Sequence, residues 1–388
     1  MTRRNMVRGK MLIALCAGLL TLAPTVATTF GVTQPRNLHE AGVYVLTNQR
    51  ENAVAAFRRD INGLLTFAGR FPTGGAGNPV AQPGDPPVDP LASQGALIMS
   101  DGNRFVIAVN AGSNQISVLR INKNTLELAD IVDSGGSRPI SATLRDDLLY
   151  VLNEGGTPNI TGFIFNECDG TLKPLPNSTR PLVGAGNADP AQIAFTPDGG
   201  SLVVTEKDGN RLDTYDVNEN GRAGPPRANP SSGTTPFGFA FNNDGTLIVS
   251  EAFALMPHQA AVSSYKLEDN GALAVISGSV HNNQTASCWI VIPNNSDIAF
   301  SSNTASGTIS SYRIGDDGSL TLLNPAAANL GIHSAPRDMA LAGGGRLLYV
   351  QIAGGERVAA FRVSGNGSLT RIDIAGGLPF GAQGITAR

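Results

Sequence analysis

Residues 191–221 read AQIAFTPDGGSLVVTEKDGNRLDTYDVNENG and carry the signals of a small antiparallel sheet. An apolar run, residues 193–195, leads into the turn sequence Pro-Asp-Gly, and a second apolar run, residues 202–204, follows it. Residues 212–215 then alternate in polarity, and Asn220-Gly221 is a hairpin signal. Apolar runs indicate strands covered on both faces, whereas alternation indicates a strand with one wet face. The stretch therefore predicts short strands joined by tight turns.

The same unit recurs along the chain. In each copy an aromatic or aliphatic residue stands six positions before a turn Gly or Asn, and the pairs are Phe57/Gly63, Val118/Asn124, Ile164/Gly170, Tyr215/Gly221, Tyr265/Gly271, Tyr312/Gly318 and Phe361/Gly367. Successive turns lie 61, 46, 51, 50, 47 and 49 residues apart, close to the roughly 40 to 50 residues of a propeller blade. The repeat predicts an all-β, seven-bladed β-propeller of four-stranded antiparallel blades.

The two ends of the repeat array complement each other. The first unit has no inner strand before Val43, whereas residues 382–387 form an unpaired strand after the seventh turn. We expect this C-terminal strand to close the ring against residues 43–46, because closure removes exposed sheet edges. The long first spacing is assigned to residues 74–94, a Gly- and Pro-rich insertion expected to be a surface loop with no blade strand until its end.

The first 27 residues differ from the rest. Four basic residues precede an apolar run, residues 11–24, and a small-residue cleavage sequence follows the run. This is the pattern of a secretory signal peptide, and the run is shorter than the roughly 20 residues that a membrane-spanning helix needs. We expect residues 1–27 to be removed and residues 28–388 to form one domain of a secreted or periplasmic protein, with no membrane span.

Composition limits the partners. The net charge is −3, and the segment expected to be cleaved holds four basic and no acidic residues, so the remainder is more acidic. An acidic surface disfavours nucleic acid and anionic membranes. Cys168 and Cys288 fall in different blades, and the four histidines lack zinc-site spacing. We expect a monomer that binds a small molecule, with no disulfide and no cofactor.

Several short segments resemble one family of propellers. They are Ser93-Gln94-Gly95, residues 110–114 (NAGSN), Thr205-Glu206-Lys207, residues 288–291 (CWIV) and Ser302-Asn303-Thr304. Together they resemble the secreted branch of the seven-bladed lactonase-like propellers, which includes the propeller-type 6-phosphogluconolactonase and carboxymuconate cyclase. The resemblance covers essentially the whole mature chain, and it implies the propeller fold and activity on a small lactone.

The chain departs from the phosphogluconolactonase pattern at two places. Residues 137–141 read SRPIS and residues 189–192 read DPAQ where histidine-containing segments would be expected, and neither histidine is present. Leu152-Asn153-Glu154 and Pro336-Arg337-Asp338 do resemble other segments of the family. Sugar-phosphate hydrolysis is therefore not the expected activity.

Oxygen-bearing side chains stand at equivalent positions where the second strands of blades two to five end. They are Asn110, Asn153, Glu206 and Glu251. Because equivalent repeat positions lie at equivalent radii, we expect the four side chains to face the central channel. They could bind substrate, hold Ca²⁺ or supply a carboxylate that activates water. The alternative is that strand ends are simply polar.

Two functions remain open. The first is an extracytoplasmic lactone hydrolase or lactone-forming cyclase in which Glu206 or Glu251 is the catalytic base, with the substrate-binding residues Asn110, Asn153, Glu154, Lys207, Trp289, Arg337 and Asp338. Within this set, Lys207 could instead form an exposed pair with Glu206, and Trp289 could instead pack in the core. The second function is a non-catalytic binding or surface propeller, because the fold hosts both.

Overall fold

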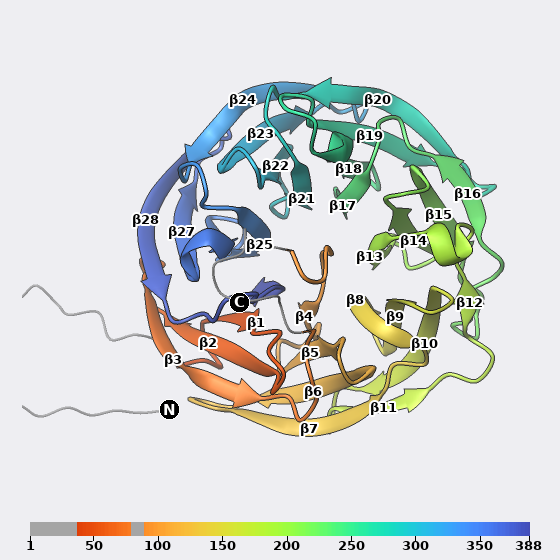
Figure 1. Cartoon of the computed structure of the whole chain (residues 1–388), viewed down its shortest axis with the longest axis vertical. Coiled ribbons are helices and arrows are strands. Elements are labelled where there is room, and N and C mark those ends of the chain that lie inside the picture. The colour runs from red at the N-terminus through yellow and green to blue at the C-terminus, as the bar shows by residue number, and fades with distance from the viewer. Residues whose placement is uncertain (1–36, 79–88) are drawn as a thin grey trace, which may run out of the picture. The chain divides into compact units, whose positions relative to one another are not determined.

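The computed structural model describes residues 37–78 and 89–388. The expected signal peptide, residues 1–27, and part of the insertion lie outside the described residues. Within them, seven β-sheets stand as blades around a central axis (Figure 1). This is the seven-bladed architecture that the repeat predicts. No helix in these two ranges is long and apolar enough to cross a membrane.

Each blade runs from an inner strand near the axis to an outer strand at the rim, and its strands follow in that order. Blade 1 is β29 (Ile385–Ala387), β1 (Gly42–Leu46), β2 (Ala53–Arg59) and β3 (Leu65–Pro72); blade 2 is β4 (Leu97–Met99), β5 (Phe105–Asn110), β6 (Gln115–Ile121) and β7 (Leu126–Asp133). Blade 3 is β8 (Ser137–Arg145), β9 (Leu148–Gly155), β10 (Asn159–Asn166) and β11 (Thr171–Pro174), with β12 (Arg180–Pro181); blade 4 is β13 (Pro190–Phe195), β14 (Ser201–Glu206), β15 (Arg211–Asp216) and β16 (Arg227–Pro230). Blade 5 is β17 (Pro236–Phe241), β18 (Leu247–Glu251), β19 (Ala261–Leu267) and β20 (Leu273–His281); blade 6 is β21 (Ser287–Val291), β22 (Ile298–Asn303), β23 (Thr308–Ile314) and β24 (Leu320–Asn329); blade 7 is β25 (Pro336–Ala342), β26 (Leu347–Ile352), β27 (Arg357–Val363) and β28 (Leu369–Gly376).

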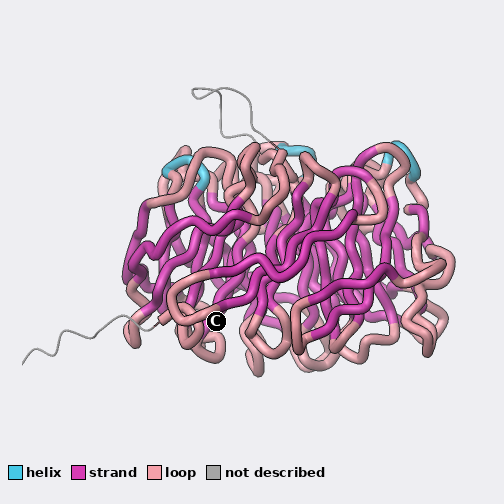
Figure 2. Tube along the Cα trace, turned by 90° about the horizontal axis from the view of Figure 1, so that it is seen from below, coloured by secondary structure: helices cyan, strands magenta, loops and turns pink. Residues whose placement is uncertain are grey.

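Burial follows the position of each strand in its blade. Second strands such as β5 and β14 are buried along their whole length, because both of their faces pack against neighbouring blades. Outer strands such as β3 and β28 contain no fully buried residue. Three short 3-10 turns, η1 (Ala185–Asn187), η2 (Phe253–Leu255) and η3 (Ala353–Gly355), lie on one face of loops (Figure 2). We call this the loop face.

The C-terminal strand closes the ring as predicted. Its partners are β1 residues, with Val43 opposite Ala387 and Val45 opposite Ile385. The guanidinium of Arg59 also donates to the carbonyl of Arg388 over 2.8 Å. The strand is shorter than predicted, since only β29 pairs and the residues before it enter the centre of the ring.

Blade 3 differs from the repeat in two details. Its outer edge is divided between β11 and β12, which both pair with β10. The repeat residue assigned to this blade, Ile164, is 36% exposed, whereas Phe163 is buried. The prediction was one residue out of register here, because this blade has two adjacent apolar residues and the alternation of a strand turns one of them to solvent.

The insertion ends inside the ring, not on its surface. Residues 89–94, which we call the plug, lead into β4 and reach the middle of the ring (Figure 1). Leu91 and Ser93 have no exposed surface. The described residues between β3 and β4 contain no strand, as predicted, but the expectation of a surface loop was wrong for the plug. An apolar leucine and a chain of backbone hydrogen bonds hold it in the channel.

We predict that truncation after Gly384 strongly destabilises the protein. It removes the three pairs of β29 and the burial of Ile385, for which about 3 kcal/mol or more of unfolding free energy is expected. Thr386→Ala, which keeps the backbone pairs, is the control. Equal chemical-denaturation midpoints for the truncated and full-length proteins would contradict this account of closure.

Candidate functional site

A β-bulge interrupts the inner strand of blades 3 to 7 near the start of its pairing with the second strand, after the first pair in blades 4 to 7 and after the second pair in blade 3. At the bulge a proline stands in four of these five blades, where the missing N–H costs no ladder bond. A bulge redirects the side chains beside it. The residues that follow are Ile140, Ala191, Phe237, Cys288 and Arg337, and Gly95 and Gln383 hold the same repeat position in blades 2 and 1. We call these seven residues the channel ring.

The plug is hydrogen-bonded to blades on several sides of the ring. The carbonyl of Ser93 accepts from Trp289 Nε1 at 2.9 Å and from Gln383 Nε2 at 3.1 Å, and its hydroxyl donates to the carbonyl of Ile140. Gln94 donates its backbone N–H to the carbonyl of Ala191 and exchanges two bonds with the backbone of Ile290. These hydrogen bonds hold the plug in the centre of the channel, below the loop face.

Arg337 is a buried cation with two nitrogen atoms that lack a hydrogen-bond partner among the described residues. Its side chain is 1% exposed, and Nε and Nη1 form no hydrogen bond with any described residue. Burial lowers the pKa of this guanidinium, while Asp89 and Cys288 act in the opposite direction. Buried polar groups are almost always paired, because an unpaired one loses its solvation without compensation. Arg337 therefore differs from the paired charges around it and is a candidate for binding an anion.

Lys207 is a second cation at the same centre. Its ammonium group lies 3.1 Å from Asp189 Oδ1, donates to the carbonyl of Ala92 and stands 5.2 Å from the ring centroid of Phe237. The side chain is 5% exposed. It does not form the exposed Glu206–Lys207 pair that the sequence left open, because its length carries the charge from the strand end to the plug.

Two carboxyl groups face these cations. Burial raises the pKa of Asp89 on the plug, and Arg337 and Lys207 lower it. Burial also raises the pKa of Glu154, whereas the positive charges of Arg138 and Lys207 lower it. Glu154 Oε2 lies 3.0 Å from Arg138 Nε, and its side chain keeps 20% exposure. Glu154 shares this partial access to water with Asp89, which is half-buried, and with Asp189, the more exposed partner of Lys207.

Trp289 and Cys288 are buried beside the plug. The indole of Trp289 stacks at a tilt on Phe237, with 5.0 Å between ring centroids, and its N–H is used by Ser93. Burial raises the pKa of the Cys288 thiol to about 12, so this thiol is protonated at neutral pH and is not an activated nucleophile. Trp289 is a packing residue beneath the centre, which is one of the two roles that the sequence allowed.

Asp338 turns away from Arg337 into the joint with blade 1. Its carboxylate accepts from the backbone N–H of Met339 at 2.9 Å and of Ile385 at 3.3 Å. Burial raises the pKa of Asp338 to about 7, although the two backbone hydrogen bonds act to lower it. The residue joins the last blade to the closing strand, and substrate contact stays a prediction.

The four strand-end residues are occupied by structural contacts. Asn110 accepts from Thr73 and Asn52 and donates to Ser117, and Asn153 donates to the carbonyl of Ser134. All four have no exposed surface. They lie in four different blades and each binds the connection that enters its own blade, so the structure does not bring them together at one site.

The two glutamates among these strand-end residues also bind the connections that enter their own blades. Glu206 accepts from the N–H of Gly184 and lies 2.7 Å from Arg211 Nε. Glu251 accepts from the N–H of Gly233 and from the hydroxyls of Ser263 and Ser279. Glu206 does have a cation beside it, as predicted for a site carboxylate, but neither residue contacts the channel ring. Their contacts favour a structural role over the catalytic role expected from the sequence.

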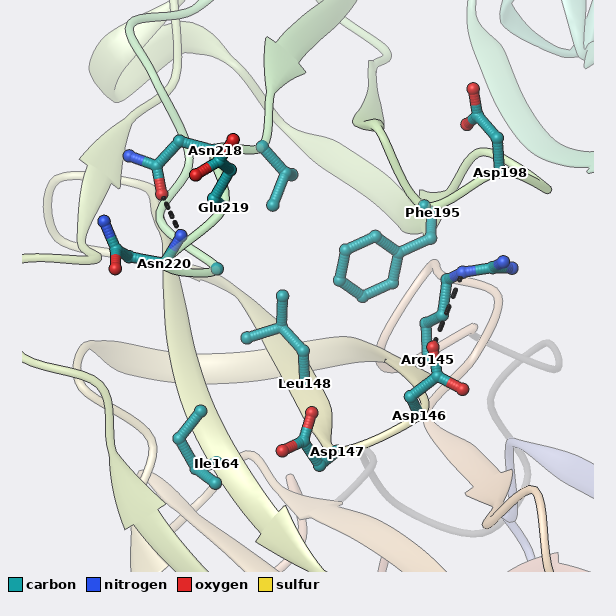
Figure 3. A pocket seen from close by; sticks show the side chains of 13 residues that line it. Arg145, Asp146, Asp147, Leu148, Ile164, Phe195, Asp198, Asn218, Glu219 and Asn220 are labelled. Carbon is teal, nitrogen blue, oxygen red and sulfur yellow. Dashed lines mark hydrogen bonds and ion pairs between the residues drawn. The ribbon is translucent and has the colours of Figure 1, made fainter.

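A separate groove lies between blades 3 and 4, where the hairpin turns of the strands meet (Figure 3). It has a volume of about 550 Å³, with Leu148 and Phe195 among its apolar walls. Asp146, Asp147 and Glu219 stand around it, and Arg145 pairs with Asp146. The groove offers no buried unpartnered charge among its described lining residues.

No group of three or more His, Cys, Asp or Glu side chains in residues 37–78 and 89–388 is arranged to hold a metal ion. The oxygen-bearing residues that could have held Ca²⁺ are engaged one by one in separate blades. Calcium binding stays an untested expectation.

Comparison with known proteins agrees with the fold. The chain matches the profile of the family described as lactonase, 7-bladed beta-propeller, over residues 39–185 and 96–253. It belongs to this lactonase-type propeller family. No curated protein matches the sequence.

Solved structures resemble the lactonase-family chain at low sequence identity. A protein from Lactobacillus plantarum has a TM-score of 0.67 at 16% identity, covering 92% of this chain and 100% of its own. The periplasmic gluconolactonase of Pseudomonas aeruginosa has a TM-score of 0.62 at 15% identity, covering 88% and 98%. A candidate 6-phosphogluconolactonase of Bacteroides uniformis has a TM-score of 0.64 at 18% identity, covering 88% and 98%. At these identities the likeness shows the fold alone.

Sequence reasoning missed four residues of this candidate site: Asp89, Arg138, Asp189 and Phe237. Arg138 and Asp189 directly precede the recurring Pro139 and Pro190, and Phe237 follows Pro236. Aligning the starts of the inner strands, instead of the ends of the second strands, would have found these three. Asp89 carried no repeat signal, because it lies on the insertion.

We predict that Glu251→Gln destabilises the protein by about 1–3 kcal/mol, because a buried carboxylate with three donors is replaced by an amide that turns a donor toward them. Thermal unfolding measures this, with Glu268→Gln on the exposed hairpin turn as the control. An unchanged melting temperature combined with lost ligand binding would restore the catalytic reading of Glu251.

Proposed function

We propose that this lactonase-family propeller hydrolyses a small lactone, a cyclic carboxylic ester, at the loop-face centre of its channel. The observation that carries the proposal is Arg337, a guanidinium buried to 1% exposure whose Nε and Nη1 have no protein partner among the described residues. Ester hydrolysis develops negative charge on the carbonyl oxygen, and preorganised donors in a site that excludes water stabilise that charge. The family and the fold agree with this reaction class.

The neighbouring groups have the chemistry that hydrolysis needs. Glu154 is the base that takes a proton from the attacking water, since its side chain keeps 20% exposure and burial raises its pKa. Arg337 binds the carbonyl oxygen, and Lys207 binds an anionic group elsewhere on the substrate. Collapse of the tetrahedral intermediate breaks the ring C–O bond, and the alkoxide takes up the proton to give a hydroxy acid.

The non-catalytic alternative keeps one specific support. The plug occupies the middle of the channel, and Trp289 and Phe237 beneath it have little or no exposed surface. A propeller that only binds a carboxylate at Arg337 would show the same features. Turnover of a lactone by the purified protein separates the two functions.

We further propose that the protein acts outside the cytoplasm. The support is the basic and apolar pattern of residues 1–27. N-terminal sequencing of the protein recovered from the periplasm or the medium tests it, and an intact Met1 in the cytoplasmic fraction would contradict it.

We predict that Arg337→Met lowers kcat/KM for lactone hydrolysis at least about 100-fold, because charged hydrogen bonds to an oxyanion contribute about 1.5–3 kcal/mol each. The variant should unfold at the same or a higher temperature, since an unpaired buried cation is replaced by an apolar chain of similar length. A panel of five- and six-membered lactones, with acid release followed by pH-stat with and without chelator, measures this.

Arg346→Met, at an exposed arginine on a hairpin turn, is the matched control and should keep full activity. Equal turnover by wild type and Arg337→Met would remove Arg337 from the mechanism. If wild type hydrolyses no lactone but binds the hydroxy acids in an Arg337-dependent way, the binding function replaces the enzymatic one.

We also predict that kcat/KM rises with pH as Glu154 loses its proton, because only the carboxylate can accept a proton from water. Burial raises the pKa of Glu154, so this limb lies above the pH at which an exposed glutamate titrates. Glu154→Gln should lose both the limb and about 100-fold or more of the rate. A Glu154→Gln enzyme with the wild-type pH profile would assign the base to another residue.

A further inference from the structure

One blade breaks a pattern that its neighbours keep. The residue at the end of the second strand meets a polar side chain two positions along the third strand, and this partner is a neutral hydroxyl in several blades. Asn110 donates to Ser117 at 2.7 Å, Glu251 accepts from Ser263 at 2.5 Å, and Asn303 donates to Ser310 at 2.8 Å. In blade 4 the same strand register places Asp213 opposite Val204, and so diagonally beside Glu206.

Blade 4 therefore sets one carboxyl group against another. Glu206 and Asp213 both have no exposed surface, and the strand register places their side chains next to each other within the blade. Asp213 Oδ1 receives no hydrogen bond from an N–H or hydroxyl donor of the described residues. The other ionisable groups that face the pair are Arg211, on Glu206, and Tyr215, which faces Asp213 and donates its hydroxyl to Pro181. Two carboxylates with one guanidinium cannot both be ionised at low cost in a buried site.

The pair holds one end of a segment that borders the channel. Residues 183–189, which we call the strap, run from the outer edge of blade 3 to β13. The N–H of Val183 donates to Asp213 Oδ2 at 2.8 Å, and the N–H of Gly184 donates to Glu206 Oε1 at 3.0 Å. At the other end Asp189 pairs with the ammonium group of Lys207, and its carbonyl accepts from the N–H of the same residue. The strap thus connects the carboxyl pair to the cation at the channel centre.

We propose that Glu206 and Asp213 share one proton, and that this pair is a pH-dependent clamp on the strap that positions Asp189 and Lys207. With the proton in place, Asp213 donates to Glu206 while both carboxyl groups still accept the strap N–H groups. When the proton leaves to solvent, two buried carboxylates face each other with one guanidinium beside them, and the strap end is released to let water in. The clamp stands on its own, and only its effect on turnover rests on the proposed function.

The direction of the pH effect follows from the same contacts. Burial first, and then the Glu206 carboxyl, raise the pKa of Asp213 from 3.8 to about 8. The folded protein therefore keeps a proton that the unfolded chain has already lost between these two values. Its stability falls as pH rises through this window, by up to tenfold in the folding equilibrium constant per pH unit, and the contribution is lost above about 8.

The repeat supplies matched variants for the test. Asp213→Ser installs the partner that blade 5 uses, and Ser263→Asp installs the blade 4 partner beside Glu251. Chemical unfolding between about pH 5 and 9 should show a loss of stability in wild type that exceeds the loss in Asp213→Ser by one proton, because Asp338 titrates equally in both. Ser263→Asp should show a larger loss than wild type. Equal pH slopes in wild type and Asp213→Ser would overturn the shared proton.

A spectroscopic measurement covers the case in which a variant fails to fold. At about pH 7 the infrared spectrum of wild type should contain the carbonyl stretch of a buried carboxylic acid that Asp213→Asn lacks, in addition to the Asp338 acid common to both proteins, and this extra band should disappear near pH 9. An identical acid band in wild type and Asp213→Asn at the lower pH would also overturn the shared proton.

The coupling to the channel has its own readout. Reductive methylation of Lys207, followed by peptide mass spectrometry, should increase several-fold from about pH 7 to about pH 9 in wild type relative to Asp213→Ser. An unchanged ratio would overturn the link to Lys207 even if the proton is shared. Absence of lactone turnover by wild type would refute the proposed function alone, because none of these three measurements needs a substrate.

Discussion

The bulge at the start of the inner strand is the constraint on which the rest of the structure depends. It places two inner-strand residues opposite one residue of the second strand, so adjacent side chains leave the strand in new directions. One of them joins the channel ring. The next one bonds the neighbouring blade, as Gln192 does with the backbone of Phe239 and Asp338 does with Ile385. The bulge therefore determines which residue of each inner strand joins the channel ring and which residue bonds the neighbouring blade.

The difference between satisfied and unsatisfied buried charges separates structure from function in this molecule. Glu251 is fully buried and receives three hydrogen bonds, so its charge is compensated within the blade. Arg337 is equally buried and leaves two nitrogen atoms without a partner among the described residues. An uncompensated buried charge lowers stability, so its presence calls for an explanation, and the proposed anionic substrate supplies one.

The fold could be predicted from the sequence because a propeller repeats its backbone. The spacing of Tyr215 and Gly221, found again in other blades, indicated the blade count, and the missing strand before Val43 indicated the closure. The register failed at Ile164, since two apolar neighbours offered the same pattern. The plug could not be predicted, because its place in the channel depends on backbone carbonyls that bind Trp289 and Gln383 across the ring.

The site was predicted only in part, for a physical reason. Lys207, Glu154 and Arg337 were named from local segments, and they do lie at the centre. Glu206 and Glu251 were chosen because equivalent positions share a radius, but radius does not decide direction. Their side chains point into the connections between blades, where Gly184 and Gly233 offer N–H groups. Direction depends on the bulge, and a bulge is visible only in the pairing of two strands.

The most direct measurement is a crystal structure of the protein soaked with the hydroxy acid that it forms, or with a simple aliphatic hydroxy acid if no turnover is found. We expect carboxylate density within hydrogen-bonding distance of Nε and Nη1 of Arg337, above the plug and beside Lys207. A carboxylate bound only in the groove between blades 3 and 4, or Arg337 paired with a protein carboxylate in that crystal, would contradict the assignment of this centre as the site.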